Sequence, residues 1–536
     1  METRHVPVLI VGGGPVGLAL AGDLGWRGVH CELVERTDGT ITSPKMNEVN
    51  ARSMEFCRRW GIAKQVHDCP FPGDWPLDVV FVTNLAGYEL GRLRRPPRNH
   101  QVNQDYGPER LQACSQTWFD PILRAFAESF PTVRLRHRTR LEWFEDRGDC
   151  VVADITDLET GSRTRVTADY LVGCDGANSM VRQALGIGLV GKGVLGTPVN
   201  LFFRAPNLLD QCGKQPGTFF LGMDREGLWA NIRIIDPEAG LWRIMAFDSG
   251  GRTAEDIDRE AMVRRAVGRP IEVEWAGVST WTRRSAVAER YSKGRVLLAG
   301  DAVHQLSPTG ALGMNTGLGD AVDLGWKLAA TVKGWGGPQL LASYDAERRP
   351  VGHRNVAMTT NFFSAQDSYA GGLAAIDDDS DAGDRLRTEI GDRLVRDVGA
   401  MFQTIGLQLG YRYEDSPIVI PDGTPATPDR PDTIVPSARP GARAPHLWMS
   451  DGRSSLDLFE RGFTLLRVGA DAPDGADLAA AAAARGVPLE TESLDEAGAD
   501  DLYACRLALI RPDGHVAWRG DTVSDAGQII DRVRGA

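Results

Sequence analysis

The chain opens with a hydrophobic strand pattern that passes directly into a helical one. Residues 6–11 are almost entirely apolar, which is typical of a strand buried on both faces of a sheet. A glycine cluster follows, then an Ala/Leu-rich stretch ending at Arg27 and a second apolar run at 31–35. Helical spacing over 48–60 stops at Gly61, a typical residue after a helix C-terminus. This alternation predicts an α/β fold.

Later parts of the chain carry other patterns. Three apolar-polar runs between 133 and 174, separated by turn residues, predict antiparallel strands, and 196–284 is again strand-rich. Helices are predicted at about 313–334 and 385–410. A stretch dense in Pro, Asp and Thr at 416–445 indicates a linker or an extended wrap, and a small α/β pattern with a hairpin around an Asp-Gly pair follows it.

Composition and charge restrict the class of protein. The 536 residues are 42% hydrophobic and 25% charged, as in ordinary globular chains. The net charge of -12 opposes binding to nucleic acid or an anionic membrane. No apolar run approaches the roughly 18 residues of a membrane helix, and the amino terminus does not resemble a signal peptide, so a cytoplasmic location is expected. Eight scattered cysteines without a CxxC pair indicate reduced thiols and no metal site.

The first glycine cluster is a dinucleotide-binding fingerprint. Gly12, Gly14 and Gly17 have GxGxxG spacing between a strand and a helix, and Glu35 ends the second strand. Gly12 permits the tight turn, Gly14 lets a pyrophosphate approach the backbone, and Gly17 allows close helix–strand packing. The helix start offers free N–H groups to phosphate, and Glu35 is placed to hold ribose hydroxyls. The fingerprint alone does not distinguish FAD from NAD(P).

Two further glycine–acid clusters follow predicted strands. One places Asp175-Gly176 before a helix with Arg182; the other runs from Gly300-Asp301 through a glycine-rich loop into a helix. An acid there can bond a ribose or ribityl hydroxyl, and such a loop can lie along a ring or a phosphate. Taken singly, each cluster is equally compatible with a glycine turn capped by Asp.

Together, three motifs resemble those of the class A flavoprotein aromatic hydroxylases. They are the fingerprint, DGxxSxVR at 175–182 and GDAxHxxxP continuing to GxNxGxxDA at 300–321. The stretch PKMNEVNARSMEF at 44–56 is similar to the phenol and 2,4-dichlorophenol hydroxylase branch. The tail from about 437 resembles that branch's redox-inactive thioredoxin-like domain, in agreement with the absent CxxC.

The resemblance implies a fold and its domains. We expect a Rossmann-like FAD-binding domain, an inserted mixed β-sheet substrate domain and a C-terminal thioredoxin-like domain. The expected ranges are 1–75, 105–185 and 285–385 for the FAD-binding domain, 76–104 and 186–284 for the substrate domain, 386–436 for a helical segment and linker, and 437–536 for the thioredoxin-like domain.

The resemblance also implies the cofactors. FAD is expected to bind tightly and non-covalently, with the loop from Pro308 along the isoalloxazine, Gln116 at the ribityl chain and Arg52 near the flavin. NAD(P)H, with NADPH favoured, is expected as a transient co-substrate near Asp175 and Arg182. The residues expected to bind cofactor are Gly12, Gly14, Pro15, Val16, Gly17, Glu35, Arg36, Lys45, Arg52, Gln116, Asp175, Gly176, Arg182, Gly300, Asp301, Pro308, Gly313, Met314 and Asn315.

Two positions depart from the family pattern. Lys45 stands where the family often has Arg, which keeps the charge but loses the bidentate fork. Ala311 follows Gly310 where the family usually has a Gly-Gly pair.

The implied reaction is hydroxylation of a phenol or phenol-like ring by O₂ through a flavin C4a-hydroperoxide, in aromatic catabolism or in tailoring of a secondary metabolite. The protein must hold the ring near the reactive oxygen and exclude water. A base that deprotonates the phenol would assist, and His304 is more often structural at its position. The residues expected in the substrate cavity are Asn47, Arg52, Arg233, Trp281, Arg283 and Tyr291.

Several alternatives stay open at this point. Trp229, Trp242 and Trp281, with Phe219, Phe220 and Phe247, either face the substrate or form core. A second possible function is that of a flavin oxidase, reductase or halogenase on the same scaffold, although the halogenase motif WxWxIP is absent. A third is that of a flavin-binding regulator without catalytic activity. The expected partners are a small aromatic substrate and O₂, with a possible homodimer.

Overall fold

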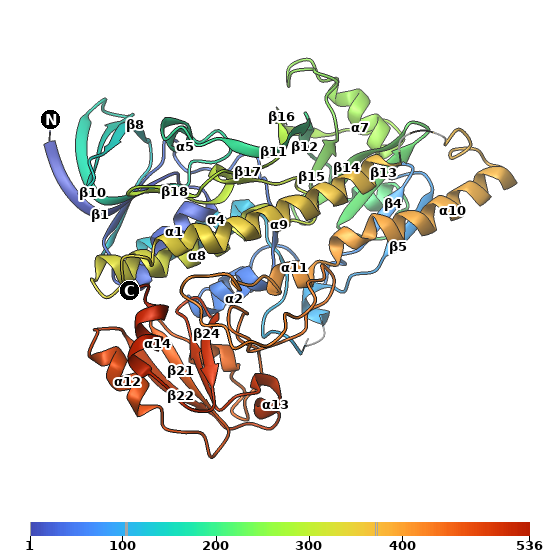
Figure 1. Ribbon diagram of the computed structural model, residues 1–536. Coiled ribbons are helices and arrows are strands. Elements are labelled where there is room, and N and C mark those ends of the chain that lie inside the picture. Colours follow the sequence, from blue (N-terminus) through green and yellow to red (C-terminus); the bar gives the residue numbers. More distant parts are fainter. Residues whose placement is uncertain (1, 102–104, 370, 372) are drawn as a thin grey trace.

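The computed structural model describes residues 2–101, 105–369, 371 and 373–536 (Figure 1). Residues 1, 102–104, 370 and 372, which fall within the expected domain ranges, lie outside the described residues.

A largely parallel sheet organises the amino-terminal half. Its strand order is β18-β19-β10-β1-β2-β7, with β9 attached to β10 and β8 to β9. β1 pairs in parallel with both β10 and β2, and the apolar run at 6–11 is buried, as its pattern predicts. The strands are β1 (Glu2–Val11), β2 (Cys31–Val34), β7 (Val133–Arg136), β8 (Thr139–Asp146), β9 (Val151–Asp157), β10 (Arg163–Gly173), β18 (Ser292–Lys293) and β19 (Val296–Leu298).

One of the strands predicted to be antiparallel is not. β7 pairs in parallel with β2, because helix α4 (Gln116–Glu128) leads into β7 as a crossover, whereas β8 and β9 form an antiparallel pair as predicted. Helix α1 (Pro15–Trp26) packs against α4 and against α8 (Gly313–Val332), so the long buried helix α8 lies over the same sheet.

A second, mixed sheet follows the order β16-β12-β15-β14-β13-β4-β5. Its two faces bury alternate residues, since Val80 and Val82 contact the core under helix α7 (Arg259–Val267), while Val79 and Phe81 contact the core on the opposite face. The strands are β4 (Val79–Val82), β5 (Glu89–Leu93), β12 (Val199–Arg204), β13 (Phe219–Asp224), β14 (Gly227–Asp236), β15 (Leu241–Ala246) and β16 (Glu274–Thr280).

Two long helices run beside this second sheet (Figure 1). Helix α9 (Ala342–Asp367) does not follow from the sequence pattern, because Pro350 lies inside it and its buried residues form no single stripe. The helix predicted at 385–410 is divided into α10 (Asp381–Asp397), the 3₁₀ turn η3 (Gly399–Phe402) and α11 (Ile405–Leu409).

Smaller elements connect the two sheets. A three-stranded sheet has the order β11-β17-β20, and β3 pairs with β6 in a ribbon, so the helix predicted from residue 48 begins only at Ala51. These elements are β3 (Glu48–Val49), β6 (Gln112–Ala113), β11 (Leu189–Gly196), β17 (Arg283–Ala288), β20 (His304–Gln305), α2 (Ala51–Arg59), α3 (Ala63–His67), α5 (Met180–Ala184), α6 (Leu208–Gln211), η1 (Arg98–His100) and η2 (Gly300–Ala302).

The C-terminal part forms a four-stranded mixed sheet of order β22-β21-β23-β24, as expected for a thioredoxin-like domain. Its core is continuous with the first half, since Phe463 packs edge-on against Trp326 of α8 at 5.9 Å. The elements are β21 (Phe463–Val468), β22 (Leu489–Leu494), β23 (Leu507–Ile510), β24 (Val516–Gly520), α12 (Ala476–Ala483), α13 (Ala499–Tyr503), α14 (Ala526–Val533) and η4 (Ser455–Leu458). Within the described residues, no helix is long and apolar enough to cross a membrane.

Candidate functional site

The three glycine–acid clusters meet at one edge of the parallel sheet. β19, β10 and β1 are parallel neighbours, and Gly300, Asp175 and Gly12 follow their carboxyl ends. In α/β folds, ligands bind beyond the carboxyl ends of the strands. The fold therefore gathers at one place the clusters that were ambiguous when taken singly.

The fingerprint glycines are required by close packing and by a positive φ. Gly12 has φ +109°, and a Cβ there would lie 2.4 Å from the carbonyl oxygen of Cys174. A Cβ on Gly17 would lie 2.0 Å from the carbonyl oxygen of Gly12, whereas one on Gly14 would meet nothing within 4 Å. Helix α1 begins after Gly14 without a side-chain cap, so its first N–H groups are available to an anion.

These features fit a dinucleotide. The carboxylate of Glu35 accepts a hydrogen bond from the N–H of Gly13 at 2.7 Å and two from Thr37, which fixes it beside the glycine loop. Pro15 and Val16 occupy the first turn of α1, and Val16 packs against Gly300 and Gly317. Arg36, in contrast, is exposed.

Asp301 lies at the start of the predicted flavin loop. Its side chain stays accessible although protein surrounds it, and burial raises its pKa, with His304 and Lys45 opposing that rise. The same loop places Ala311 at φ +53°, in the left-handed region that favours glycine. The left-handed conformation explains why the family usually has glycine at position 311. Nδ2 of Asn315 holds the strained turn by donating to the carbonyl of Ala311 at 2.8 Å.

The β3–β6 ribbon connects the flavin loop to helix α4. The N–H of Lys45 donates to Oε1 of Gln116 at 3.0 Å, and Nδ2 of Asn315 donates to the carbonyl of Glu48 at 3.1 Å. Nε2 of Gln116 donates to Asp120 at 3.0 Å, and burial raises the pKa of Asp120 to about 7. Lys45, Gln116 and Asn315 are thus brought together, as a shared cofactor site requires. Of the remaining loop residues, Pro308 is exposed, and Gly313 and Met314 begin α8 half-buried.

The Asp175 cluster is joined to the flavin loop by Arg182. Its Nη1 donates to the carbonyls of Ala177 at 3.2 Å and Ala302 at 2.9 Å, so Arg182 supports the backbone there. Asp175 accepts from the N–H of Val181 through Oδ2, while its buried Oδ1 has no partner among the described residues. Gly176 has φ +79° in the intervening turn.

Two expected site residues point elsewhere. Arg52 is buried and donates to Glu55, to Tyr411 and to the backbone carbonyl of Asp513, which directs it toward the C-terminal part and not toward the flavin loop. Tyr291 lies in the core of the first half, with its ring centroid 5.8 Å from that of Tyr344 and 6.4 Å from that of His304.

Buried arginines gather on the face of the second sheet opposite α7. Arg243 on β15 lies opposite Arg233 on β14, which lies opposite Phe219 on β13. Nη2 of Arg233 reaches Oε1 of Glu48 at 3.3 Å and the carbonyl of Asn47 at 3.4 Å. Burial alone would raise the pKa of Glu48, but Arg95 and Arg233 outweigh it and hold this pKa below its usual value.

Among the described residues, no acid bonds Arg243 or Arg283, and Asp367 acts on Arg283 only through its charge. No described residue bonds any of the three side-chain nitrogens of Arg283, which faces the rings of Phe363 at 4.6 Å and Trp281 at 5.8 Å. Burial lowers the pKa of Arg283 to about 10. Burial, followed by repulsion from Arg233, lowers the pKa of Arg243 to about 9. Other buried atoms with no partner among the described residues include Oδ1 of Asn47, Oδ1 of Asn200, Oδ1 of Asn231 and Nε1 of Trp281.

The aromatic residues that were expected either to face the substrate or to form core lie on both faces of the second sheet. Phe219 and Phe247 contact the core on the arginine-bearing face, whereas Trp242 and Phe220 pack under α7 as ordinary core. Trp229 also packs against the α7 side, because the register of β13 and β14 shifts at this point and leaves Trp229 as a bulged residue of β14, unpaired with β13.

Sequence reasoning missed Arg243, Glu48 and the His304–Asp320 pair. Arg243 had a visible signal, since a charged residue inside the apolar strand LWRIMA is buried at a cost and requires a partner. His304 is fully buried, and its Nε2 lies 2.7 Å from Oδ2 of Asp320, which also accepts from the N–H of Gly300 at 3.1 Å.

Known proteins resemble this chain over nearly its whole length. A family model described as FAD binding domain matches residues 5–359, and one described as aromatic-ring hydroxylase, C-terminal, matches residues 437–535. A putative polyketide hydroxylase of Streptomyces halstedii is 35% identical, covering 97% of this chain and 94% of the relative. The 2,4-dichlorophenol 6-monooxygenase of Cupriavidus pinatubonensis is 28% identical, with coverages of 99% and 96%. Among solved structures, RebC with bound 7-carboxy-K252c superposes with a TM-score of 0.92 at 42% identity, and each chain is covered completely.

Proposed function

The chain belongs to the FAD-dependent aromatic-ring hydroxylases, and from this we propose that it hydroxylates an aromatic substrate that carries a carboxylate. The single observation behind the proposal is that two buried arginines, Arg243 and Arg283, are bonded by no acid among the described residues, while Asp367 acts on Arg283 only through its charge. A desolvated guanidinium is costly unless an anion pairs with it. A carboxylate on the substrate meets this need, because it accepts two parallel N–H bonds from one arginine.

Related proteins support this substrate class. The structural relative RebC holds 7-carboxy-K252c, an aromatic ligand with a carboxy group, and sequence relatives include polyketide hydroxylases. We therefore place the substrate among extended aromatic acids of secondary metabolism, in preference to simple phenols.

Each group on this face has a proposed task. Glu48 neutralises Arg233, which leaves Arg243 and Arg283 for the substrate. Phe219, Phe247 and Trp281 offer aromatic surfaces to the ring and keep water out. Bound FAD supplies the activation of O₂, and the protein holds the ring against it.

We also propose the cofactor contacts. Gly14 and the first turn of α1 hold the FAD pyrophosphate, Glu35 the adenosine ribose, and Gln116, Asp175 and Asp301 the ribityl and phosphate oxygens. FAD is held tightly without a covalent bond, and NADPH is the preferred reductant. The enzyme works in the cytoplasm as a homodimer. Rates with NADPH and NADH, light scattering and cell fractionation test these points separately.

A matched pair of compounds tests the substrate class. An extended aromatic acid should stimulate NAD(P)H oxidation and yield a product heavier by one oxygen atom, while its methyl ester should bind at least tenfold more weakly, because the arginines lose a charged acceptor. Equal turnover of acid and ester would contradict the proposal.

A further inference from the structure

One turn of the C-terminal domain enters the FAD-binding half. The turn at 511–515 joins β23 to β24, and its backbone carbonyls point at arginines of two helices. The carbonyl of Pro512 accepts from Arg59 at 2.8 Å and from Arg27 at 3.3 Å, and that of Asp513 accepts from Arg52 at 2.9 Å. The turn therefore contacts the residue that follows the C-terminal end of α1 and residues at both ends of α2.

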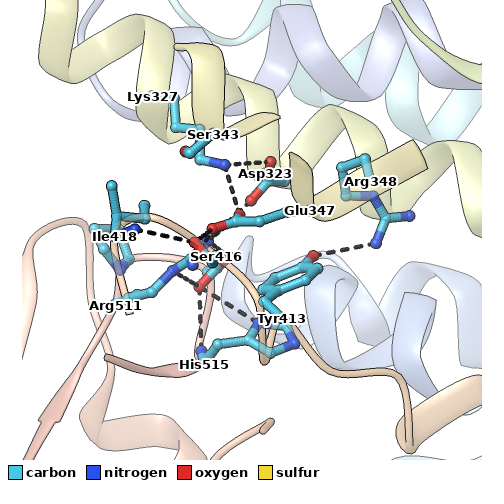
Figure 2. A network of polar contacts seen from close by, with 12 residues as sticks. Asp323, Lys327, Ser343, Glu347, Arg348, Tyr413, Ser416, Ile418, Arg511 and His515 are labelled. Atoms are coloured by element: carbon cyan, nitrogen blue, oxygen red, sulfur yellow. Dashed lines mark hydrogen bonds and ion pairs between the residues drawn. The ribbon is translucent and has the colours of Figure 1, made fainter. Parts of the chain in front are cut away.

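Arg511 of this turn completes a buried ion cluster between α8 and α9. Its guanidinium donates to both carboxylate oxygens of Glu347, at 2.7 and 2.8 Å, and to Asp323 at 3.0 Å. Lys327 approaches the same two acids from the opposite side, at 2.6 and 2.8 Å (Figure 2). The acids Asp323, Glu347 and Asp513 are close enough together to hold a metal ion, but Arg511 and Lys327 already pair with them. Burial raises the pKa of Asp323, which favours its uncharged form and leaves two charged acids for the two cations.

The cluster continues to the flavin loop through Arg348. Arg348 follows Glu347 on α9 and donates to Oδ1 of Asp320 at 2.8 Å and to the hydroxyl of Tyr413 at 3.1 Å. Asp320 in turn accepts from the N–H of Gly300 and contacts His304. Tyr413 stacks on His515 of the same turn, with ring centroids 4.3 Å apart, and so forms a second route from the turn to Arg348. Every member of this chain of contacts is buried.

We propose that Arg511 and Tyr413 are positioning residues for FAD, and that the 511–515 turn of the C-terminal domain sets the place of the Gly300–Asp301 loop. The turn orients α8 and α9 through Glu347 and orients Arg348 through Tyr413. Arg348 then fixes Asp320, which holds the loop backbone. The role is independent of which substrate is bound.

Two conservative variants of the full-length holoenzyme test this. Tyr413→Phe removes the hydroxyl that accepts from Arg348 and retains the stacked ring. Arg511→Lys keeps a charge but loses the fork that spans both oxygens of Glu347. The matched controls are Tyr503→Phe, whose hydroxyl bonds the carbonyl of Pro445 in its own domain, and Arg519→Lys, which pairs with Asp422 and not with the buried cluster.

The readouts are the FAD dissociation constant, from ultrafiltration of holoenzyme, and the rise in melting temperature on adding FAD. That rise depends on FAD affinity and not on stability alone. We expect Tyr413→Phe to weaken FAD binding about threefold to tenfold and Arg511→Lys tenfold or more, with both controls unchanged. If the variants lower the melting temperature with and without FAD equally, and FAD affinity stays within twofold, the proposal is overturned. Should Arg511→Lys fail to fold, Tyr413→Phe alone decides between the two results.

Discussion

We expect Arg243 to bind the substrate and, because it is buried, to lower the stability of the substrate-free protein. Burial, followed by repulsion from Arg233, lowers the pKa of Arg243 from its usual value to about 9. Each pKa unit corresponds to about 1.4 kcal/mol, so charging this guanidinium inside the fold costs on the order of 5 kcal/mol. Because the folded pKa lies below the unfolded one, this cost is complete below about pH 9 and is relieved as the pH rises above that value.

The substitution Arg243→Met should therefore stabilise the protein at neutral pH. Methionine fills similar space without a charge, and we expect a gain of about 1–4 kcal/mol, seen as a higher melting temperature. The same variant should bind the aromatic acid about tenfold to hundredfold more weakly, since a charged hydrogen bond is lost, while affinity for the ester changes little.

Differential scanning fluorimetry and substrate titration measure the two effects. Arg204→Met is the control, because Arg204 lies on neighbouring β12 with a side chain 40% exposed and should tolerate the change with little effect on either quantity. A lower melting temperature in Arg243→Met would refute the reasoning about burial. An equal loss of affinity for acid and ester would refute the assigned role.

Three further predictions follow from the cofactor site. Gly14→Val should fold and yet release FAD, because its Cβ meets no described protein atom but projects beside the free N-terminal end of α1. Gly17→Ala should instead lower the melting temperature even without FAD. Flavin content and thermal scans separate the two outcomes. Ala311→Gly should stabilise the protein by about 1 kcal/mol by relieving the left-handed turn, and an unchanged melting temperature would count against strain there. Because burial raises the pKa of Asp120 above its unfolded value, its contribution to stability should decline as pH rises from about 4 to about 7, and Asp120→Asn should flatten this part of the pH–stability curve.

The flavin half could be predicted from sequence because its information is local. The GxGxxG spacing, the two Asp-Gly turns and their flanking strands are short patterns with one physical use, and the family, fold class and flavin chemistry expected from them are confirmed. Helix α9 could not be predicted, because it is buried on several sides and so shows no single apolar stripe, and because it contains Pro350. The direction of Arg52 could not be predicted, because its partner is the carbonyl of Asp513, 461 positions away.

The substrate side could be predicted only in outline. Arg233, Trp281 and Arg283 were expected in the substrate cavity, but Arg243 was not. Its importance depends on the strand register, which places it opposite Arg233, a second cation. Tyr291 was expected in the substrate cavity, but the chain after β17 carries it into the core of the first half.

The packing of β21 against Trp326 also has a consequence for biogenesis. A ribosome releases the flavin-binding half long before residue 511, so during translation Asp323 and Glu347 have only Lys327 as counter-ion and the aromatic surface of α8 is uncovered. On the proposal that the 511–515 turn places the Gly300–Asp301 loop, we expect FAD to load only after residue 511 has folded, and a chain truncated before this turn to be isolated as apoprotein.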